Sequence, residues 1–484
     1  MKVTIETLMK KSGVAFGTSG ARGRVEEMTS PLCHAYTTGF LKYLEQIGAC
    51  GNSGAVAVGG DLRPSTARIM RAVVQAILDA GLQPIYCGCV PSPALALYGL
   101  EQKIPSIMVT GSHIPADRNG IKFNTPNGEI LKRDEMGIRQ QEVNIPSEEK
   151  AETPSLPPEN PAAREVYLQR FLRAFPADCL KGKRLGFYQH SAVGRELIPE
   201  IFSALGAEVE LLGFSETFIP VDTEAIRPED TQLAKKWAQT GHFDALLSTD
   251  GDSDRPLLSD EHGNWMRGDV LGILAAKYLG AKSVHVPVNS NTALEKSGWF
   301  SEVSRTRIGS PFVIASMIQA EKAGKSGVVG YEANGGFLTQ TSFELEGSTL
   351  APLPTRDAVL PVLATLLLSI REEKTLSQLL ETLPARFTTS DRIQHFPPEE
   401  SQKILRQLAG KEEIESFFGT VLGSLQSINE TDGLRMTFSS SEILHLRPSG
   451  NAPEFRCYAE ADSSERAEEI LQTALQIIKK METT

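Results

Sequence analysis

The chain has 484 residues, of which 40% are hydrophobic and 23% are charged. A single hydrophobic core stops growing at roughly 250 to 300 residues, so three or four domains are expected. The composition is typical of a soluble globular protein and excludes disorder on a large scale. The formal net charge is −11, which disfavours nonspecific nucleic-acid binding because the phosphate backbone would be repelled.

No signal peptide or membrane span is predicted. The first six residues lack the apolar stretch of a signal peptide, and no window approaches the roughly 18 uninterrupted apolar residues of a membrane span. The six cysteines do not have the spacing of a small disulfide-stapled secreted domain. We therefore expect a cytoplasmic protein that binds neither membrane nor nucleic acid.

Short apolar runs alternate with amphipathic segments along most of the chain, as is typical of βα units that build mostly parallel sheets. A linker is expected at 146–161, where prolines and polar residues replace the apolar periodicity. Strands are expected at 55–58, 106–109, 184–188, 245–248, 283–288 and 327–330.

The pattern changes from about Leu368 onward. A polar helical stretch near 375–383 and shorter strands at 434–438 and 443–446 predict an α+β domain. The chain closes with an amphipathic helix, at whose start Asp462 and Glu465 resemble a capping pair.

Four of the expected strands run directly into loops rich in glycine, serine or aspartate. Ligands of open α/β sheets bind outside the carboxyl ends of the strands, so chemistry is expected in these loops. The loops lie at 59–61, 110–112, 249–252 and 331–335.

Asp250, Asp252 and Asp254 fall at alternate positions just after an apolar strand. Carboxylate oxygens are hard ligands that suit magnesium or calcium. An EF-hand loop is the first rival, but its sixth position needs glycine where Arg255 stands, and a strand precedes the loop instead of a helix. An acidic cluster that only caps a turn would leave three like charges repelling one another. The pattern therefore favours a metal site, with magnesium preferred if a phosphate supplies further oxygens.

Ser112 follows the strand at 106–109, and Gly111 before it allows a close backbone approach. Alone, such a serine is more often a turn or cap residue. No Gly-x-Ser-x-Gly sequence surrounds it, so a hydrolase triad is not indicated. In an extended backbone His113 would point to the opposite side, which would make it a poor direct base for Ser112.

A basic segment near the C-terminus places Arg447 and Arg456 around a Ser-Gly-Asn turn. Guanidinium forks, exposed amides and a hydroxyl together make a phosphate cradle. An ordinary surface turn is the alternative interpretation.

Taken together and in this order, five motifs resemble those of the α-D-phosphohexomutases, the phosphomannomutase and phosphoglucomutase superfamily, over nearly the whole chain. The family's sugar-recognition loop usually carries serine and histidine where this chain has Asn334 and Gly336, so any role of that histidine is absent or moved elsewhere. The five motifs are the N-terminal signature at 16–23, the phosphoserine loop at 110–115, the metal loop at 250–255, the sugar-recognition loop at 331–336 and the phosphate-binding loop at 447–453.

The resemblance implies three related mixed-sheet α/β domains and a C-terminal α+β domain around a central cleft. Each domain is expected to contribute one loop to the site. The expected domains are 1–150 with the phosphoserine loop, 160–262 with the metal loop, 263–370 with the sugar-recognition loop and 371–484 with the phosphate-binding loop.

The resemblance also implies an isomerase that interconverts hexose 6-phosphate and hexose 1-phosphate through a phosphoserine and a bound 1,6-bisphosphate. Mannose phosphates are the leading pair, with glucose and glucosamine phosphates as rivals. A noncatalytic hexose-phosphate sensor and a phosphatase that forms phosphoserine and releases the phosphate to water are further alternatives. We expect a monomer or homodimer with a small phosphosugar as substrate, Mg²⁺ as cofactor and a hexose 1,6-bisphosphate as activator.

Residue roles follow from the same resemblance. Phosphorylated Ser112 would bind one Mg²⁺ together with the three aspartates. Lys122 would act as a general acid or base, Arg22 would lie near the phosphoserine, and Arg255 would stabilise the transferred group. The remaining roles are sugar binding by Glu332 and Asn334, and phosphate binding by Arg447, Ser449, Gly450 and Asn451.

Overall fold

The structure is a computed structural model that describes residues 2–17, 20–51, 53–345, 347–449 and 454–482. The chain folds into two compact units. The first comprises Met1–Val284 and Gly309–Leu379, and the second comprises His285–Ile308 and Leu380–Thr484.

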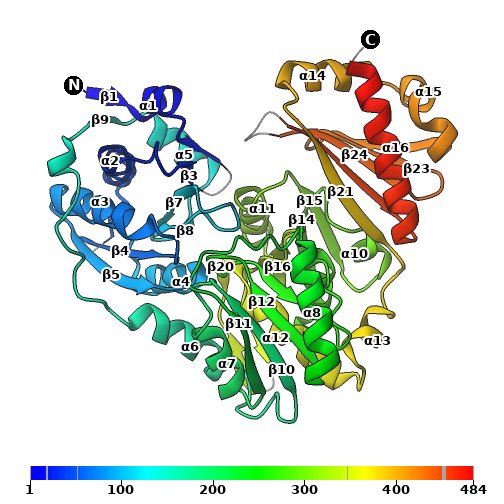
Figure 1. Cartoon of the computed structure of the whole chain (residues 1–484), viewed down its shortest axis with the longest axis horizontal. Coiled ribbons are helices and arrows are strands. Elements are labelled where there is room, and N and C mark those ends of the chain that lie inside the picture. The colour runs from blue at the N-terminus through cyan, green and yellow to red at the C-terminus, as the bar shows by residue number, and fades with distance from the viewer. Residues whose placement is uncertain (1, 18–19, 52, 346, 450–453, 483–484) are drawn as a thin grey trace. The chain divides into compact units, whose positions relative to one another are not determined.

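The N-terminal part of the first unit is built on a mixed sheet with the strand order β2-β3-β7-β6-β4-β5, and β8 pairs with β7 (Figure 1). Strand β4 is buried along its whole length, as is usual for a central parallel strand. The strands are β2 (Ala15–Phe16), β3 (Ala21–Arg24), β4 (Ala55–Gly60), β5 (Gln83–Cys89), β6 (Ser106–Val109), β7 (Arg118–Thr125) and β8 (Gly128–Glu129), with a separate pair β1 (Lys2–Thr4) and β9 (Glu142–Asn144).

Helices cover this sheet and complete its core. In α3 the buried residues Ile69, Met70, Val73 and Ile77 recur at helical spacing, which gives the helix one apolar face. The rings of Phe40 and Phe123 join helix to sheet with centroids 4.7 Å apart. The helices are α1 (Ile5–Ser12), α2 (Ser30–Gln46), α3 (Thr66–Asp79), α4 (Ser92–Gln102) and α5 (Lys132–Arg139).

The middle of the first unit contains a four-stranded sheet with the order β11-β10-β12-β13. Strands β12 and β13 pair antiparallel and are joined by the predicted metal loop, residues 250–255. The elements are α6 (Ala162–Ala174), β10 (Arg184–His190), α7 (Leu197–Ala204), β11 (Glu208–Phe214), α8 (Pro228–Gly241), β12 (Ala245–Thr249) and β13 (Pro256–Leu258).

A third group of strands in the first unit carries the predicted sugar-recognition loop. Strand β16 pairs antiparallel with β17, and β17 pairs antiparallel with β20, so that residues 332–336 connect the first two strands. The elements are α9 (Gly268–Leu279), α11 (Ser310–Lys322), β16 (Val328–Tyr331), β17 (Phe337–Thr339), β18 (Phe343–Leu345), β19 (Ser348–Leu350), β20 (Leu353–Asp357) and α12 (Val359–Arg371). Strand β14 (Ser283–Pro287) and helix α13 (Leu376–Leu380) begin in the first unit and end in the second.

The second unit has an antiparallel sheet with the order β21-β25-β24-β23-β22, and α14, α15 and α16 share one hydrophobic core with it (Figure 1). Its elements are α10 (Ala293–Lys296), β15 (Glu302–Thr306), β21 (Phe387–Gln394), α14 (Pro398–Gln407), α15 (Lys411–Leu422), β22 (Leu425–Asn429), β23 (Leu434–Phe438), β24 (Ile443–Pro448), β25 (Glu454–Ala461) and α16 (Ser464–Glu482).

These elements confirm the predicted fold class, mixed-sheet α/β followed by α+β. The six predicted strands correspond to β4, β6, β10, β12, β14 and β16, each within two residues of the predicted bounds. The predicted cap of the last helix was wrong: the backbone N–H of Arg466 donates to Ser463 Oγ at 3.2 Å, so the serine beside Asp462 accepts the bond.

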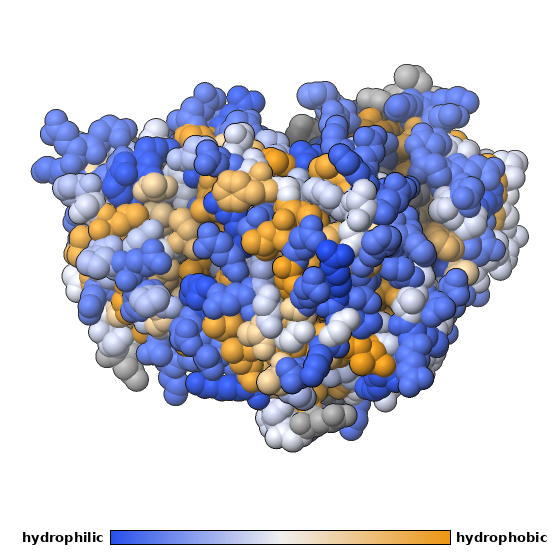
Figure 2. All heavy atoms as spheres, turned by 60° about the horizontal axis from the view of Figure 1, so that its bottom comes forward, coloured by the Kyte–Doolittle hydropathy of each residue, from blue (hydrophilic) through white to orange (hydrophobic). Residues whose placement is uncertain are grey.

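The surface is chemically mixed. Figure 2 shows a face on which hydrophobic residues form several patches separated by hydrophilic ones. Among the described residues, every helix is too short or too polar to cross a membrane.

Candidate active site

The hairpin between β12 and β13 carries three buried aspartates. Asp250, Asp252 and Asp254 each offer a carboxylate oxygen, and these oxygens lie within 4.8 Å of one another. Asp252 Oδ1 and Asp254 Oδ1 are buried and have no hydrogen-bond partner among the described residues. A buried carboxylate oxygen without a partner is costly unless a cation satisfies it. The aspartate triad could therefore bind a metal ion.

Lys122, on β7, faces the aspartate triad. Its Nζ donates to Asp252 Oδ2 at 2.5 Å and to Asp254 Oδ2 at 2.7 Å. Burial acts to raise the pKa of Asp252, but the Lys122 ammonium and the hydrogen bond from Ser92 together outweigh burial and lower it. For Asp250, burial and repulsion from the other two carboxylates raise the pKa well above its usual range. A bound cation would favour the ionised form of all three.

Ser112 points its hydroxyl at the aspartate triad. The residue is fully buried after β6, and its Oγ donates to Asp250 Oδ2 at 2.6 Å. Its φ of 55° places it in the left-handed region, and its backbone N–H donates to Thr110 Oγ1 at 2.8 Å. The loop therefore turns the side chain inward from the end of the strand.

The prediction that His113 points away from Ser112 was wrong. The distance between Ser112 Oγ and His113 Nδ1 is 3.3 Å, because Ser112 is left-handed and not extended. Burial, with repulsion from Arg255 and Arg22, lowers the pKa of His113 well below its usual range. The imidazole beside the serine is therefore neutral at pH 7.

A buried ion pair holds the predicted phosphoserine loop, residues 110–115, in shape. The Asp61 and Arg63 side chains are fully buried, and Arg63 Nε donates to Asp61 Oδ2 at 3.1 Å. The Asp61 carboxylate also accepts a bond of 2.7 Å from Thr110 Oγ1. The guanidinium of Arg63 donates further to backbone carbonyl oxygens of Ser112 (2.7 Å), Ile114 (2.5 Å), Pro115 (2.7 Å) and Arg118 (3.1 Å).

Arg255 and Arg22, two further residues predicted to act in the site, lie near the aspartate triad. Arg255 Nε is 3.9 Å from Asp250 Oδ2 and 3.8 Å from Asp254 Oδ1. This buried nitrogen has no hydrogen-bond partner in the described part of the chain. Desolvation and repulsion from Arg255 and Arg356 lower the pKa of Arg22 to about 10. Arg22 is therefore close enough to feel the charges around the triad, and it stays protonated at pH 7.

The sugar-recognition loop reaches the triad through Arg356, which the sequence analysis did not identify. Arg356 donates to Asp254 Oδ2 from Nε at 3.0 Å and from Nη2 at 2.8 Å, and from Nη1 to Glu332 Oε2 at 3.2 Å. Asn334 Oδ1 accepts the backbone N–H of Gly336 at 3.0 Å, which closes the loop. Glu332 and the aspartate triad are thus joined by one guanidinium.

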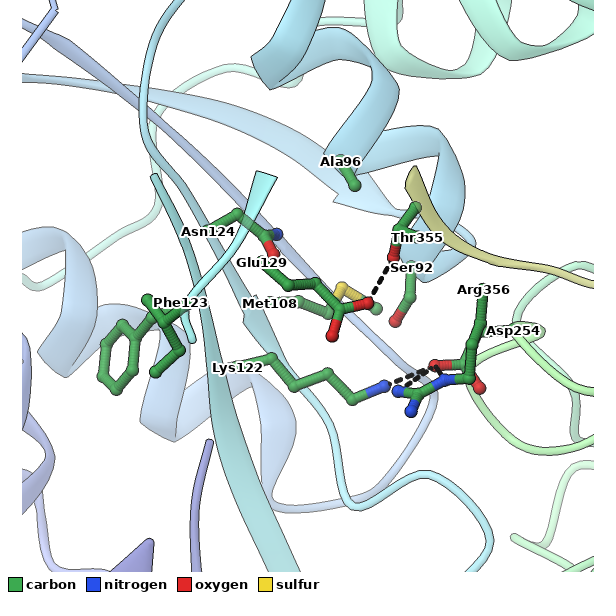
Figure 3. Close-up of a pocket in the computed structure, with 11 residues that line it drawn as sticks. Ser92, Ala96, Met108, Lys122, Phe123, Asn124, Glu129, Asp254, Thr355 and Arg356 are labelled. Atoms are coloured by element: carbon green, nitrogen blue, oxygen red, sulfur yellow. Dashed lines mark hydrogen bonds and ion pairs between the residues drawn. The ribbon is translucent and has the colours of Figure 1, made fainter. Parts of the chain in front are cut away.

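Figure 3 shows the cationic side of this arrangement. Lys122 and Arg356 converge on Asp254, and Glu129 accepts a bond of 2.6 Å from Thr355 Oγ1. These residues line a cavity of about 20 Å³, enough for one water molecule.

The predicted phosphate-binding loop belongs to the second unit. Arg447 Nε donates to Asp432 Oδ1 at 3.0 Å, and the backbone N–H of Ser449 donates to the carbonyl of Glu454 at 2.8 Å. Gly450 and Asn451 lie outside the described residues. The phosphate-binding role of this loop stays a prediction.

The structure thus brings most of the predicted residues together within the first unit. Their individual roles stay predictions. The residues concerned are Arg22, Ser112, Lys122, Asp250, Asp252, Asp254, Arg255, Glu332 and Asn334.

Comparison with known proteins identifies the family. Models of the phosphoglucomutase/phosphomannomutase alpha/beta/alpha domain I, alpha/beta/alpha domain III and C-terminal domain match residues 13–147, 267–387 and 394–476. A phosphomannomutase of Salmonella muenchen is 42% identical over 98% of this chain and 97% of its own length. A phosphoglucosamine mutase of Carboxydothermus hydrogenoformans is 25% identical over 97% of this chain and 100% of its own length.

A solved structure has the same fold. A phosphoglucomutase/phosphomannomutase family protein from Burkholderia thailandensis covers 96% of this chain and 96% of its own, with a TM-score of 0.72 and 21% identity. The resemblance predicted from the five motifs is therefore confirmed, and the chain belongs to the phosphoglucomutase/phosphomannomutase family of mutase enzymes.

Proposed function

We propose that this mutase interconverts mannose 6-phosphate and mannose 1-phosphate and carries the transferred phosphate on Ser112. The observation that carries the proposal is the hydroxyl of Ser112, which lies 2.6 Å from Asp250 Oδ2 beside two carboxylate oxygens that lack partners among the described residues. The choice of mannose follows the relative with 42% identity, since the phosphoglucosamine mutase relative is more distant at 25%.

Asp250, Asp252, Asp254 and the phosphate on Ser112 would hold one Mg²⁺. Hard carboxylate and phosphate oxygens are the ligands that this ion prefers, and the two orphaned carboxylate oxygens fit such a site. The ion would neutralise charge on the transferred phosphoryl group.

Phosphoryl transfer requires mainly positioning and cations near the equatorial oxygens. Phosphoserine gives its phosphoryl group to the free hydroxyl of a hexose phosphate: the bond to Ser112 Oγ breaks and a bond to the sugar oxygen forms. Lys122 Nζ is the proposed proton carrier between the two oxygens, with His113 Nδ1 beside Ser112 as the second candidate. Arg255 and Arg22 would stabilise the transferred charge.

The resulting hexose 1,6-bisphosphate turns over and returns its other phosphate to Ser112. A bisphosphate of this kind would also activate an unphosphorylated enzyme. Glu332 and Asn334 would bond the sugar hydroxyls. The non-reacting phosphate would bind to Arg447, Ser449, Gly450 and Asn451.

The remaining expectations belong to the same proposal. The enzyme would act on small phosphosugars in the cytoplasm, without nucleic-acid or membrane partners, as a monomer or homodimer. Residues 1–150, 160–262, 263–370 and 371–484 are proposed as its four domains.

Incubation of the purified protein with Mg²⁺, a trace of hexose 1,6-bisphosphate and the 1-phosphates of mannose, glucose and glucosamine tests the function. We expect conversion of mannose 1-phosphate to the 6-phosphate and a phosphate on Ser112 by mass spectrometry. Ser112→Ala should abolish both, whereas Ser155→Ala, at an exposed linker position, should change neither. Release of free phosphate in place of isomer would indicate a phosphatase, and binding without turnover would indicate a sensor.

A further inference from the structure

Arg356 stands at the centre of the contacts between the metal loop and the sugar-recognition loop. The residue is 3% exposed, near the end of β20. Two of its nitrogens bond the same oxygen of Asp254, and Nη1 bonds both Glu332 Oε2 at 3.2 Å and Ser310 Oγ at 3.1 Å. A planar guanidinium can serve two carboxylates in fixed directions, which an ammonium cannot do.

Gly336 leaves the space that Arg356 fills. A Cβ built on Gly336 would lie 2.5 Å from Arg356 Cδ and 2.6 Å from Cγ, closer than non-bonded carbons approach. The φ of Gly336 is outside the left-handed region, so its backbone does not itself require glycine. The need for glycine at this position therefore comes from the arginine packed over it.

We propose that Arg356 and Gly336 form a paired positioning device that orients Asp254 for the metal and Glu332 for the sugar. The proposal rests on the proposed function and adds to it a residue that acts through these two carboxylates. With Asp254 Oδ2 held by Arg356 and Lys122, Oδ1 is the oxygen left for a cation.

Both carboxylates depend on the same guanidinium, so its loss should disturb metal and sugar binding together. Arg356→Ala should weaken metal affinity and raise the sugar-phosphate KM, each by about 10- to 100-fold, as is usual when a partner of a ligand is removed. Arg356→Lys keeps the charge but offers a compact ammonium in place of the planar fork. It should therefore restore at most one of the two quantities, the metal affinity or the sugar-phosphate KM.

A double-mutant cycle tests the pairing. The variants are Gly336→Ala, Arg356→Ala and the double variant, each compared with the wild type by thermal unfolding, by Mn²⁺ titration calorimetry and by sugar-phosphate KM and kcat. Gly336→Ala alone should lower Tm and weaken Mn²⁺ affinity, because the new methyl group displaces the arginine. In the Arg356→Ala background the same change should have a much smaller effect, because Cγ and Cδ of residue 356 are gone and only its Cβ, 2.9 Å from the new methyl group, remains to be met.

Gly419→Ala is the matched control. Gly419 also has an ordinary φ, and the nearest atom to a Cβ there is 3.5 Å away, so this change should lower neither Tm nor Mn²⁺ affinity. Additive effects of Gly336→Ala and Arg356→Ala would overturn the pairing. A lower Tm for Arg356→Ala with unchanged Mn²⁺ affinity and unchanged KM would overturn the positioning role.

Failure of this inference is distinguishable from failure of the proposed function. If the wild type converts no hexose phosphate, the mutase reaction is refuted. The Tm cycle and the Mn²⁺ affinities still decide whether Gly336 and Arg356 are coupled and whether Arg356 orients Asp254.

Discussion

Replacement of Arg63 by methionine is the sharpest test of how the phosphoserine loop is held. Arg63→Met keeps an unbranched side chain that reaches as far as the arginine Nε, but removes the donors to four backbone carbonyls and to Asp61. Because both side chains are fully buried, the Asp61 carboxylate would lose its cationic partner inside the protein.

The expected loss of stability follows from this burial. Removal of one partner from a buried ion pair costs about 3 to 5 kcal/mol, and water can replace only part of the carbonyl bonds. We expect the free energy of unfolding of the first unit to fall by about 4 kcal/mol. Burial already raises the pKa of Asp61 in the presence of Arg63, so the unpaired carboxyl would take up a proton and limit the loss.

The reaction should suffer separately from stability. The carbonyl of Ser112 is one of the acceptors of Arg63, so the loop can shift when the guanidinium is removed. A displacement of about 1 Å at the reacting serine costs about 100-fold in rate. We therefore expect phosphorylation of Ser112 by hexose 1,6-bisphosphate to slow about 100-fold under conditions where the variant is still folded.

Urea unfolding and rapid-quench mass spectrometry of Ser112 measure the two effects. Arg24→Met is the control, because Arg24 is exposed and its ion pair with Glu26 is 3.6 Å long, and it should change the free energy of unfolding by less than about 0.5 kcal/mol. Asp61→Asn combined with Arg63→Met should recover part of the stability, since no charge is then left unpaired. Wild-type stability and wild-type phosphorylation in Arg63→Met would refute the reasoning.

Three further predictions concern charge and binding. Asp432→Ala should raise the KM for the sugar phosphate about tenfold, because Asp432 accepts a hydrogen bond of 3.0 Å from Arg447. The phosphorylation rate of Ser112 should change little. An unchanged KM would contradict this prediction. Burial lowers the pKa of His445 from 6.5 to about 4, so the contribution of this residue to the free energy of unfolding is fully present above pH 6.5, and about 2 to 3 kcal/mol of it is lost as pH falls to 4.5. When the free energy of unfolding in urea is measured between pH 6.5 and 4.5, His445→Gln should remove this part of its fall with pH. A fall as large as that of the wild type would assign it to other groups. Calorimetry should show at least tenfold tighter Mg²⁺ binding when Ser112 is phosphorylated, and equal affinities would count against a shared site.

The strands and the reactive loops could be predicted because their signals are local. Buried runs such as 245–248 are continuous in sequence, and the aspartates follow them directly. The backbone conformation of Ser112 has no such local signal, since the neighbouring residues do not predict a left-handed φ of 55° at a serine. The predicted direction of His113 was wrong for that reason.

The two buried arginines were missed for a different reason. Arg356 pairs with Asp254, 102 residues earlier, and Arg63 bonds carbonyls from 49 residues onward in the chain. A lone arginine in a sequence is read as a surface residue unless its partner is known. Arg356 packs so closely over Gly336 that no side chain fits there. In the sequence, the only sign of this contact is a glycine in place of the family's histidine.

The buried charges explain why metal and phosphate should bind together. Around the aspartate triad, the cations of Lys122, Arg255 and Arg356 already face the three carboxylates, so the protein groups come close to balance on their own. A dication added alone would leave excess positive charge in a region of low dielectric, and a phosphoserine of about −2 added alone would face three carboxylates. Added together, the two charges cancel within the site. We therefore expect the affinity for Mg²⁺ to rise when Ser112 is phosphorylated, through charge balance, whichever hexose phosphate is the substrate.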